Sequence, residues 1–75
     1  MASEIARFKF SDKSNSEGFK KSKEKLKDAF GYEGWEVVYQ TIFDTSGYSY
    51  IRINSDIRDG GAARSICMVY GGILC

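Results

Sequence analysis

The chain contains no histidine, and this absence removes whole classes of catalytic chemistry. Histidine is the commonest general base in enzymes, and it activates the nucleophile in Ser-His-Asp and Cys-His sites. Two carboxylate pairs remain, Glu33 with Glu36 and Asp56 with Asp59. Both pairs fall in turns or at strand starts, where solvated surface charge is the ordinary interpretation. We therefore expect no catalytic residues and no enzyme activity.

Disulfides and metals also have few residues to draw on. The two cysteines, Cys67 and Cys75, are eight positions apart. In a strand that separation spans about 25 Å, far beyond the reach of a disulfide. Histidine is missing, and no loop of alternating Asp and Asn closed by Glu is present to hold calcium. We expect no disulfide, no metal and no cofactor, and we interpret Cys67 as a small apolar strand residue.

The length of 75 residues indicates a single domain, residues 1–75, with a small core. A chain of this size buries only about 60% of its unfolded surface. Small proteins compensate with disulfides, metals or self-association, and only self-association remains here, so we expect a homo-oligomer. No apolar run approaches the roughly 18–20 residues of a membrane span. The N-terminus resembles no secretory signal, so a cytoplasmic location without membrane contact is expected.

Hydrophobic periodicity predicts an α+β domain with the order β-α-β-β-β. Expected strands cover residues 5–10, 35–43, 48–54 and 65–70, and the expected helix covers residues 15–30. Gly31 is well placed to end that helix in a left-handed conformation. The polar segment 55–64 is predicted to be a loop. The result is a four-stranded mixed or antiparallel sheet with one helix packed on one face. The first strand could lie beside the second or beside the last.

Apolar residues are expected on both faces of this sheet. The predicted core comprises Phe8, Phe10, Phe19, Leu26, Phe30, Trp35, Val37, Ile51, Ile53 and Met68. Val38, Ile42, Cys67 and Val69 are expected on the opposite face. A single helix cannot cover both faces. A twin subunit or a partner protein is therefore expected on the second face.

Residues 31–39, with the sequence Gly-Tyr-Glu-Gly-Trp-Glu-Val-Val-Tyr, follow the predicted helix. This segment resembles a family of small bacterial and phage domains of unknown function, in which a helix ends in a glycine turn and a Gly-Trp-Glu-(Leu/Val)-Val strand follows. The layout is also similar to short sporulation-associated proteins built as β-α-β-β. The resemblance covers about ten residues of motif and implies a fold; no activity comes with either family.

Aromatic residues and an arginine gather in the predicted strands. Tyr39, Tyr48, Tyr50 and Arg52 have the composition of protein-interface hot spots. These four residues are the candidate partner-binding site, for a protein partner or a second copy. Small domains of this type are often encoded by phages as stoichiometric inhibitors of host defence complexes. That role is our hypothesis for a binding protein without catalysis.

Lysines of the predicted helix support a second hypothesis, nucleic-acid or nucleotide binding. Lys20, Lys23 and Lys27 line one flank of the helix, and the strand tyrosines could stack bases. Residues 1–27 carry eight basic and four acidic residues, a net +4, whereas residues 28–75 carry a net −3. The total of +1 weakens the counterion-release contribution. Whether the Gly60-Gly61 loop binds an anion is left open.

Overall fold

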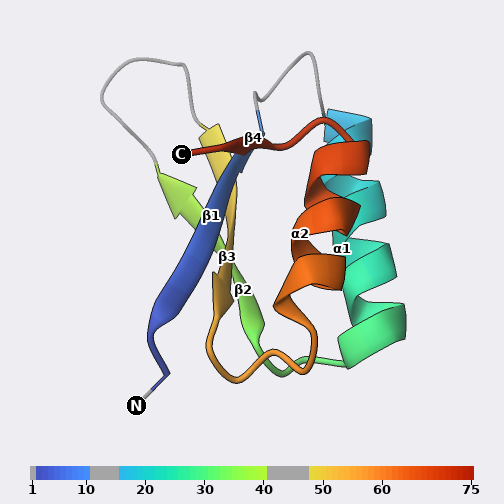
Figure 1. Ribbon diagram of the computed structural model, residues 1–75. Helices are drawn as coiled ribbons and strands as arrows, with labels where there is room; N and C mark the ends of the chain where they lie inside the picture. Colours follow the sequence, from blue (N-terminus) through green and yellow to red (C-terminus); the bar gives the residue numbers. More distant parts are fainter. Residues whose placement is uncertain (1, 11–15, 41–47) are drawn as a thin grey trace.

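The computed structural model describes residues 2–10, 16–40 and 48–75. They form six elements: β1 (Glu4–Phe10), α1 (Ser16–Phe30), β2 (Trp35–Gln40), β3 (Tyr48–Asn54), α2 (Gly60–Val69) and β4 (Ile73–Leu74) (Figure 1). The α+β class and the four-stranded sheet are confirmed. The predicted turn at Asp44–Gly47 and the end of the second predicted strand, Thr41–Phe43, lie outside the described residues.

The sheet is antiparallel throughout, with the strand order β2-β3-β1-β4. The first strand thus lies between the third and the fourth. Helix α1 connects β1 to β2, which are separated by β3, and α2 connects β3 to β4, which are separated by β1. Two interleaved units of this kind make the split β-α-β arrangement of ferredoxin-like domains.

A second helix replaces the strand that the sequence predicts at residues 65–70. Helix α2 begins after Asp59, whose side chain accepts a hydrogen bond from the backbone N–H of Ala62 at 3.1 Å. An N-cap of this kind satisfies a backbone donor that the first turn leaves unpaired. Gly60 and Gly61 form the first turn of α2, so the predicted Gly-rich loop at this position is also wrong.

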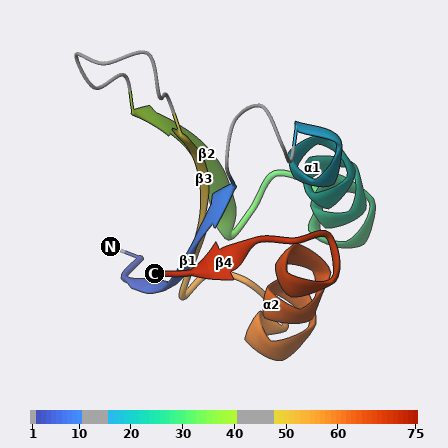
Figure 2. The ribbon, with the colours of Figure 1, turned by 90° about the horizontal axis from the view of Figure 1, so that it is seen from above.

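Both helices cover the same face of the sheet, and the described residues leave the other face uncovered (Figures 1 and 2). The core lies between the helices and the sheet. Its buried hydrophobic residues are Ala6, Phe8, Phe10, Phe19, Leu26, Ile51, Ile53, Ile57, Ala63 and Cys67, with Phe30, Trp35, Val37 and Ile66 partly buried against them. Nine of the ten predicted core residues are therefore in or against the core.

Met68 is the exception among the predicted core residues. Its side chain is 61% exposed, because the helical turn that directs Ala63 and Cys67 inward carries Met68 to the outside. Cys67, which was predicted to be a strand residue on the opposite face of the sheet, lies in α2 and is fully buried in the core.

The turn between α1 and β2 is held by backbone and side-chain contacts. Gly31 has φ = 66°, and its N–H donates to the Lys27 carbonyl at 2.9 Å, which confirms it as the left-handed cap of α1. The indole Nε1 of Trp35 donates to the Gly31 carbonyl at 2.9 Å. Gly34 has φ = 89° and passes directly over the backbone of Ile57. This turn fixes where β2 starts relative to the end of α1.

Among the described residues, no helix has the length and apolar character needed to cross a membrane.

Alanine substitutions at Gly31 and Gly34 should differ in cost. Both residues have positive φ, which costs an alanine about 1–2 kcal/mol. A Cβ at Gly34 would also lie 2.5 Å from the Cα of Ile57, whereas nothing lies within 4 Å of a Cβ at Gly31. Overpacking adds about 1–3 kcal/mol to this cost. Gly34→Ala should therefore lower the free energy of unfolding by about 3 kcal/mol and Gly31→Ala by about 1 kcal/mol. Urea unfolding measures both; equal losses would contradict the close approach.

Replacing Ser22 by alanine should stabilise the protein. Ser22 is fully buried in α1, and its Oγ has no hydrogen-bond partner in the part of the chain described. An unsatisfied buried hydroxyl costs about 1–3 kcal/mol, and alanine is the better helix former by about 0.5 kcal/mol. We expect Ser22→Ala to gain about 1–2 kcal/mol in thermal or urea unfolding. The exposed Ser65→Ala in α2 is the control and should gain only the helix-propensity part; a destabilised Ser22→Ala would show that the hydroxyl has a partner.

Candidate functional site

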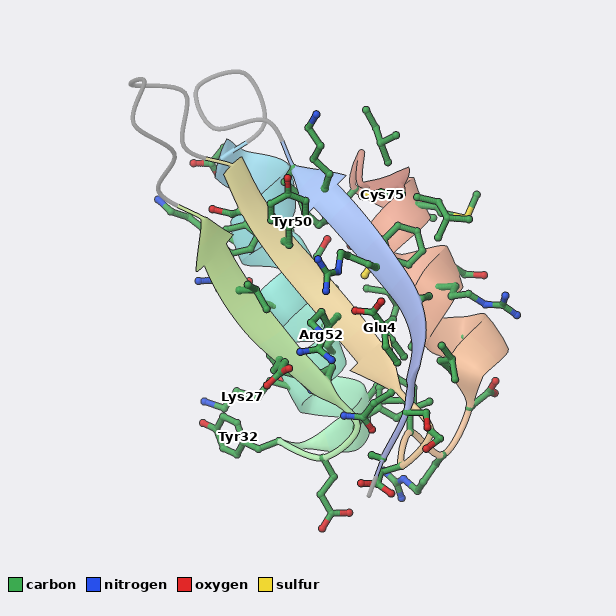
Figure 3. The ribbon with its side chains drawn as sticks, turned by 90° about the vertical axis from the view of Figure 1, so that its left-hand side faces the viewer. Glu4, Lys27, Tyr32, Tyr50, Arg52 and Cys75 are labelled. Atoms are coloured by element: carbon green, nitrogen blue, oxygen red, sulfur yellow. The ribbon has the colours of Figure 1, made fainter. Side chains whose placement is uncertain are left out.

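The uncovered face of the sheet carries charged and aromatic side chains from three adjacent strands. Strand alternation places Arg7 and Lys9 of β1 beside Arg52 and Tyr50 of β3, with which they are paired in register. On the other side of β3, Glu36 and Val38 of β2 pair with the same two residues. Figure 3 looks onto this face and shows Glu4 and Arg52 pointing toward one another, with Tyr50 farther along β3. We call these seven residues, Glu4 included, the open face.

An ion-pair network joins the arginines and glutamates of the open face. Glu4 Oε1 accepts hydrogen bonds from Arg7 Nε at 3.0 Å and from Arg52 Nε at 2.8 Å. Arg52 Nη1 lies 2.7 Å from Glu36 Oε1. Arg52 therefore bridges a carboxylate of β1 and a carboxylate of β2. The Arg7 hydrogen bond, together with the charges of both arginines, holds the pKa of Glu4 below its ordinary value.

Tyr50 lies next to this network and is half-buried. The guanidinium carbon of Arg7 is 5.9 Å from the centre of the Tyr50 ring, within the range of a cation–π contact. Tyr50 is paired with Lys9 on one side and with Val38 on the other. The ring is thus flanked by basic and apolar side chains and is held in place by its neighbours.

The structure brings together two of the four predicted partner-binding residues, Tyr50 and Arg52. Tyr39 is paired with Ser49 and Tyr48 with Gln40 in the backbone register, but the side chains of both tyrosines lie outside the described residues. Sequence reasoning missed Glu4 and Glu36, which hold the arginines. These carboxylates reach Arg52 only because β1 and β2 pair with β3, and the local sequence pattern does not predict that pairing.

The predicted apolar second face of the sheet is wrong for the described residues. Of its four expected members, Val38 lies on the open face, but Cys67 and Val69 belong to α2 and not to the sheet. Ile42 lies outside the described residues. Val38 is paired with Tyr50, and the other described members of this face are charged, so the described part of the face is not an apolar surface.

Exposed apolar residues instead gather in α2 and β4. Met68 and Val69 at the end of α2, and Ile73 and Leu74 of β4, are each more than half exposed. A groove of about 450 Å³ between α1 and α2 has Ala29, Ile66, Val69 and Tyr70 among its lining residues. Apolar surface of this kind is common at protein contacts.

The three predicted nucleic-acid-binding lysines line one cavity. Lys20, Lys23 and Lys27 surround a space of about 340 Å³ together with Glu24, Tyr32 and Trp35. The Lys27 ammonium lies 5.4 Å from the centre of the Tyr32 ring, and a hydrogen bond with Tyr32 raises the pKa of Lys27. Figure 3 shows these two side chains close together beside β2. Tyr32 and Trp35 were not predicted for this site. They come close to the lysines only because the chain reverses in the turn after α1, and local sequence pattern does not show that contact.

The two thiols lie in different environments. Cys67 is fully buried, and burial raises the pKa of its thiol to about 12, so it is a poor nucleophile at neutral pH. Cys75 is exposed, and its Sγ lies 3.6 Å from the Ile73 carbonyl. Among the residues described, no group of three or more carboxylates and thiols is arranged to hold a metal ion.

No family model, no curated protein and no solved structure matches this chain. The resemblance carried by residues 31–39 therefore stays a prediction.

Stability should depend on pH through Glu4. Its pKa is lowered in the folded state, so the ionised carboxylate stabilises the fold above its unfolded pKa. That contribution is lost as the pH falls through the folded pKa, below 4.5. In thermal melts Glu4→Gln should be less stable than the native chain at pH 7, and the difference should shrink toward pH 3. Glu33→Gln makes the same charge change outside the network and serves as the control. A difference that does not change with pH would contradict the network.

Proposed function

We propose that this chain is a non-enzymatic protein-binding domain whose contact surface is the open face, with Tyr50, Arg52 and Arg7 at its centre. The observation that carries the proposal is the position of these three residues on adjacent strands, with both arginines held by Glu4. Tyrosine and arginine are the residue types enriched where protein interfaces concentrate their binding energy.

Preorganisation of the arginines supports this choice. A free arginine loses side-chain entropy when a partner immobilises it, about 0.5–1.5 kcal/mol for each rotamer-rich side chain. Arg52 is already held by Glu4 and Glu36 from both neighbouring strands, and Arg7 by Glu4. Each guanidinium still has N–H groups beyond these contacts to offer to a partner's carbonyl or carboxylate oxygens. Binding a partner would therefore cost less side-chain entropy than it would if Arg7 and Arg52 were free.

Charge balance favours a protein over a nucleic acid on this particular face. Arg7, Lys9 and Arg52 supply three positive charges, and Glu4 and Glu36 remove two. A phosphate approaching Arg52 would also approach two carboxylates that already accept from it. Few counterions would be released, and counterion release is the main source of affinity for nucleic acid.

A partner protein or a second copy of the chain could occupy the open face. Binding through a fixed surface acts stoichiometrically, by occupying a partner's surface. An inhibitor of a larger complex, including a phage inhibitor of a host defence complex, would work in this way. We hold that role as part of the proposal.

The test compares Tyr50→Ala with the control Lys21→Ala, an exposed α1 residue on the helical layer. Self-association is measured by sedimentation equilibrium, and protein partners by quantitative affinity capture with the tagged chain. At a hot spot worth about 2 kcal/mol, Tyr50→Ala should weaken the contact about 30-fold. The control should change it little. A folded Tyr50→Ala variant that keeps the same self-association and the same partners would overturn the proposal.

A further inference from the structure

We propose that the cavity beside α1 and the α1–β2 turn binds a nucleotide unit, in which a phosphate lies next to an aromatic base. The cavity is lined by Lys20, Lys23, Glu24, Lys27, Tyr32 and Trp35. We call it the lysine cavity. It lies on the helical side of the β2 edge, so this inference does not rest on the function proposed for the open face.

Positive charge is concentrated in the lysine cavity. Lys20, Lys23 and Lys27 occur at helical spacing on one face of α1, so their ammonium groups reach the same space. Among the described residues, Glu24 is the one acidic member of the lining, and Asp28 on the same helix acts on Lys27. Three lysines against one lining carboxylate give a local excess of positive charge that the whole chain, at +1, does not have. Such a group of ammonium ions attracts phosphate.

Two aromatic rings lie next to these lysines. Tyr32 is 76% exposed, whereas Trp35 is partly buried against the core and fixed by its hydrogen bond to the Gly31 carbonyl. A large exposed ring on a turn that is tied down at Gly31 offers a stacking surface for a planar base. Phosphate alone would need only the lysines. The rings are the reason for assigning a nucleotide.

The neighbouring cavity sets the orientation of the ligand. A space of about 640 Å³ shares Tyr32 and Trp35 with the lysine cavity, but its charged lining residues are Glu33, Glu36 and Asp56. These carboxylates repel phosphate, so the phosphate lies on the α1 side. Exocyclic amino groups of a base can donate to carboxylates, so the base lies over Tyr32 toward the acidic side. The lysine cavity, at about 340 Å³, has the size of a small-ligand site.

Charge alone must be separated from the geometry of the cavity, and α1 supplies a matched control. Lys20→Gln with Lys27→Gln removes two charges from the cavity. Lys21→Gln with Lys25→Gln removes two charges from the same helix, at residues that do not line it. The probes are a fluorescent oligodeoxyadenylate, whose bases carry an exocyclic amino group, and ATP, inorganic phosphate and polyglutamate. They are used in fluorescence-anisotropy binding and competition at about 150 mM salt, where the Debye length is about 8 Å. Circular dichroism melts verify that each variant folds.

We expect the cavity pair to weaken binding at least tenfold and the control pair less than about threefold. Tyr32→Ala should weaken binding about tenfold, as the loss of one stacked base does, and Tyr32→Phe should restore it. Competition by ATP identifies a free nucleotide as the ligand. Oligodeoxyadenylate binding that ATP does not displace identifies a single strand. Both outcomes support the assignment.

Three results would overturn it. Equal weakening by the two lysine pairs would show that diffuse helix charge, and not the cavity, attracts the probe. Binding unaffected by Tyr32→Ala, with inorganic phosphate or polyglutamate competing as well as ATP, would reduce the site to a general anion or acidic-protein contact. Failure of the native chain to bind either the oligonucleotide or ATP below about 1 mM, a free energy of about −4 kcal/mol, would remove the site altogether.

Discussion

The pairing of β1 with β3 at the centre of the sheet is the constraint on which the rest of the structure depends. It places Phe8 opposite Ile51, both fully buried, and it leaves β2 and β4 as the two edges. Each helix must then cross over one strand, and both cover the same face. Because side chains alternate along a strand, the same register that buries Phe8 and Ile51 directs Arg7 and Arg52 to the other face. The core and the open face are therefore two consequences of one register.

Elements with a single strong periodicity could be predicted from the sequence. Helix α1 was expected at residues 15–30 and is observed at Ser16–Phe30, and β3 was expected and observed at residues 48–54. Residues 60–70 could not be assigned in this way, because their apolar residues fit two periods. Ile66, Met68 and Tyr70 alternate as in a strand, while Ala63 and Cys67, and Ile66 and Tyr70, are four apart as in a helix. Packing favours the helix, since in a helix Ala63 and Cys67 both point into the core between α2 and the sheet.

Local sequence pattern also predicted only part of each candidate site, and tertiary contacts supplied the rest. Tyr50 and Arg52 lie two apart on one strand, and Lys20, Lys23 and Lys27 lie at helical spacing on one helix, so local pattern was sufficient to group them. Glu4 and Glu36 reach Arg52 only through strand pairing across 48 and 16 positions of the sequence. Tyr32 and Trp35 reach the lysines only because Gly31 and Gly34 reverse the chain. Contacts made by tertiary structure carry no local periodicity.

The two surfaces differ in how their charges are compensated, and this difference argues for two kinds of ligand. On the open face each arginine is already paired with a carboxylate, so a partner gains little from charge alone and must match the shape of Tyr50 and its neighbours. In the lysine cavity Lys23 and Lys27 lie against the rings of Phe19 and Tyr32, contacts that add no negative charge, and Asp28 on the same helix compensates part of the charge of Lys27. A ring contact does not neutralise the ammonium group, so a phosphate can approach Lys23 and Lys27 while these ring contacts remain. This difference supports the two proposals made above, a shape-selective contact on the sheet and an anion-binding site beside the first helix.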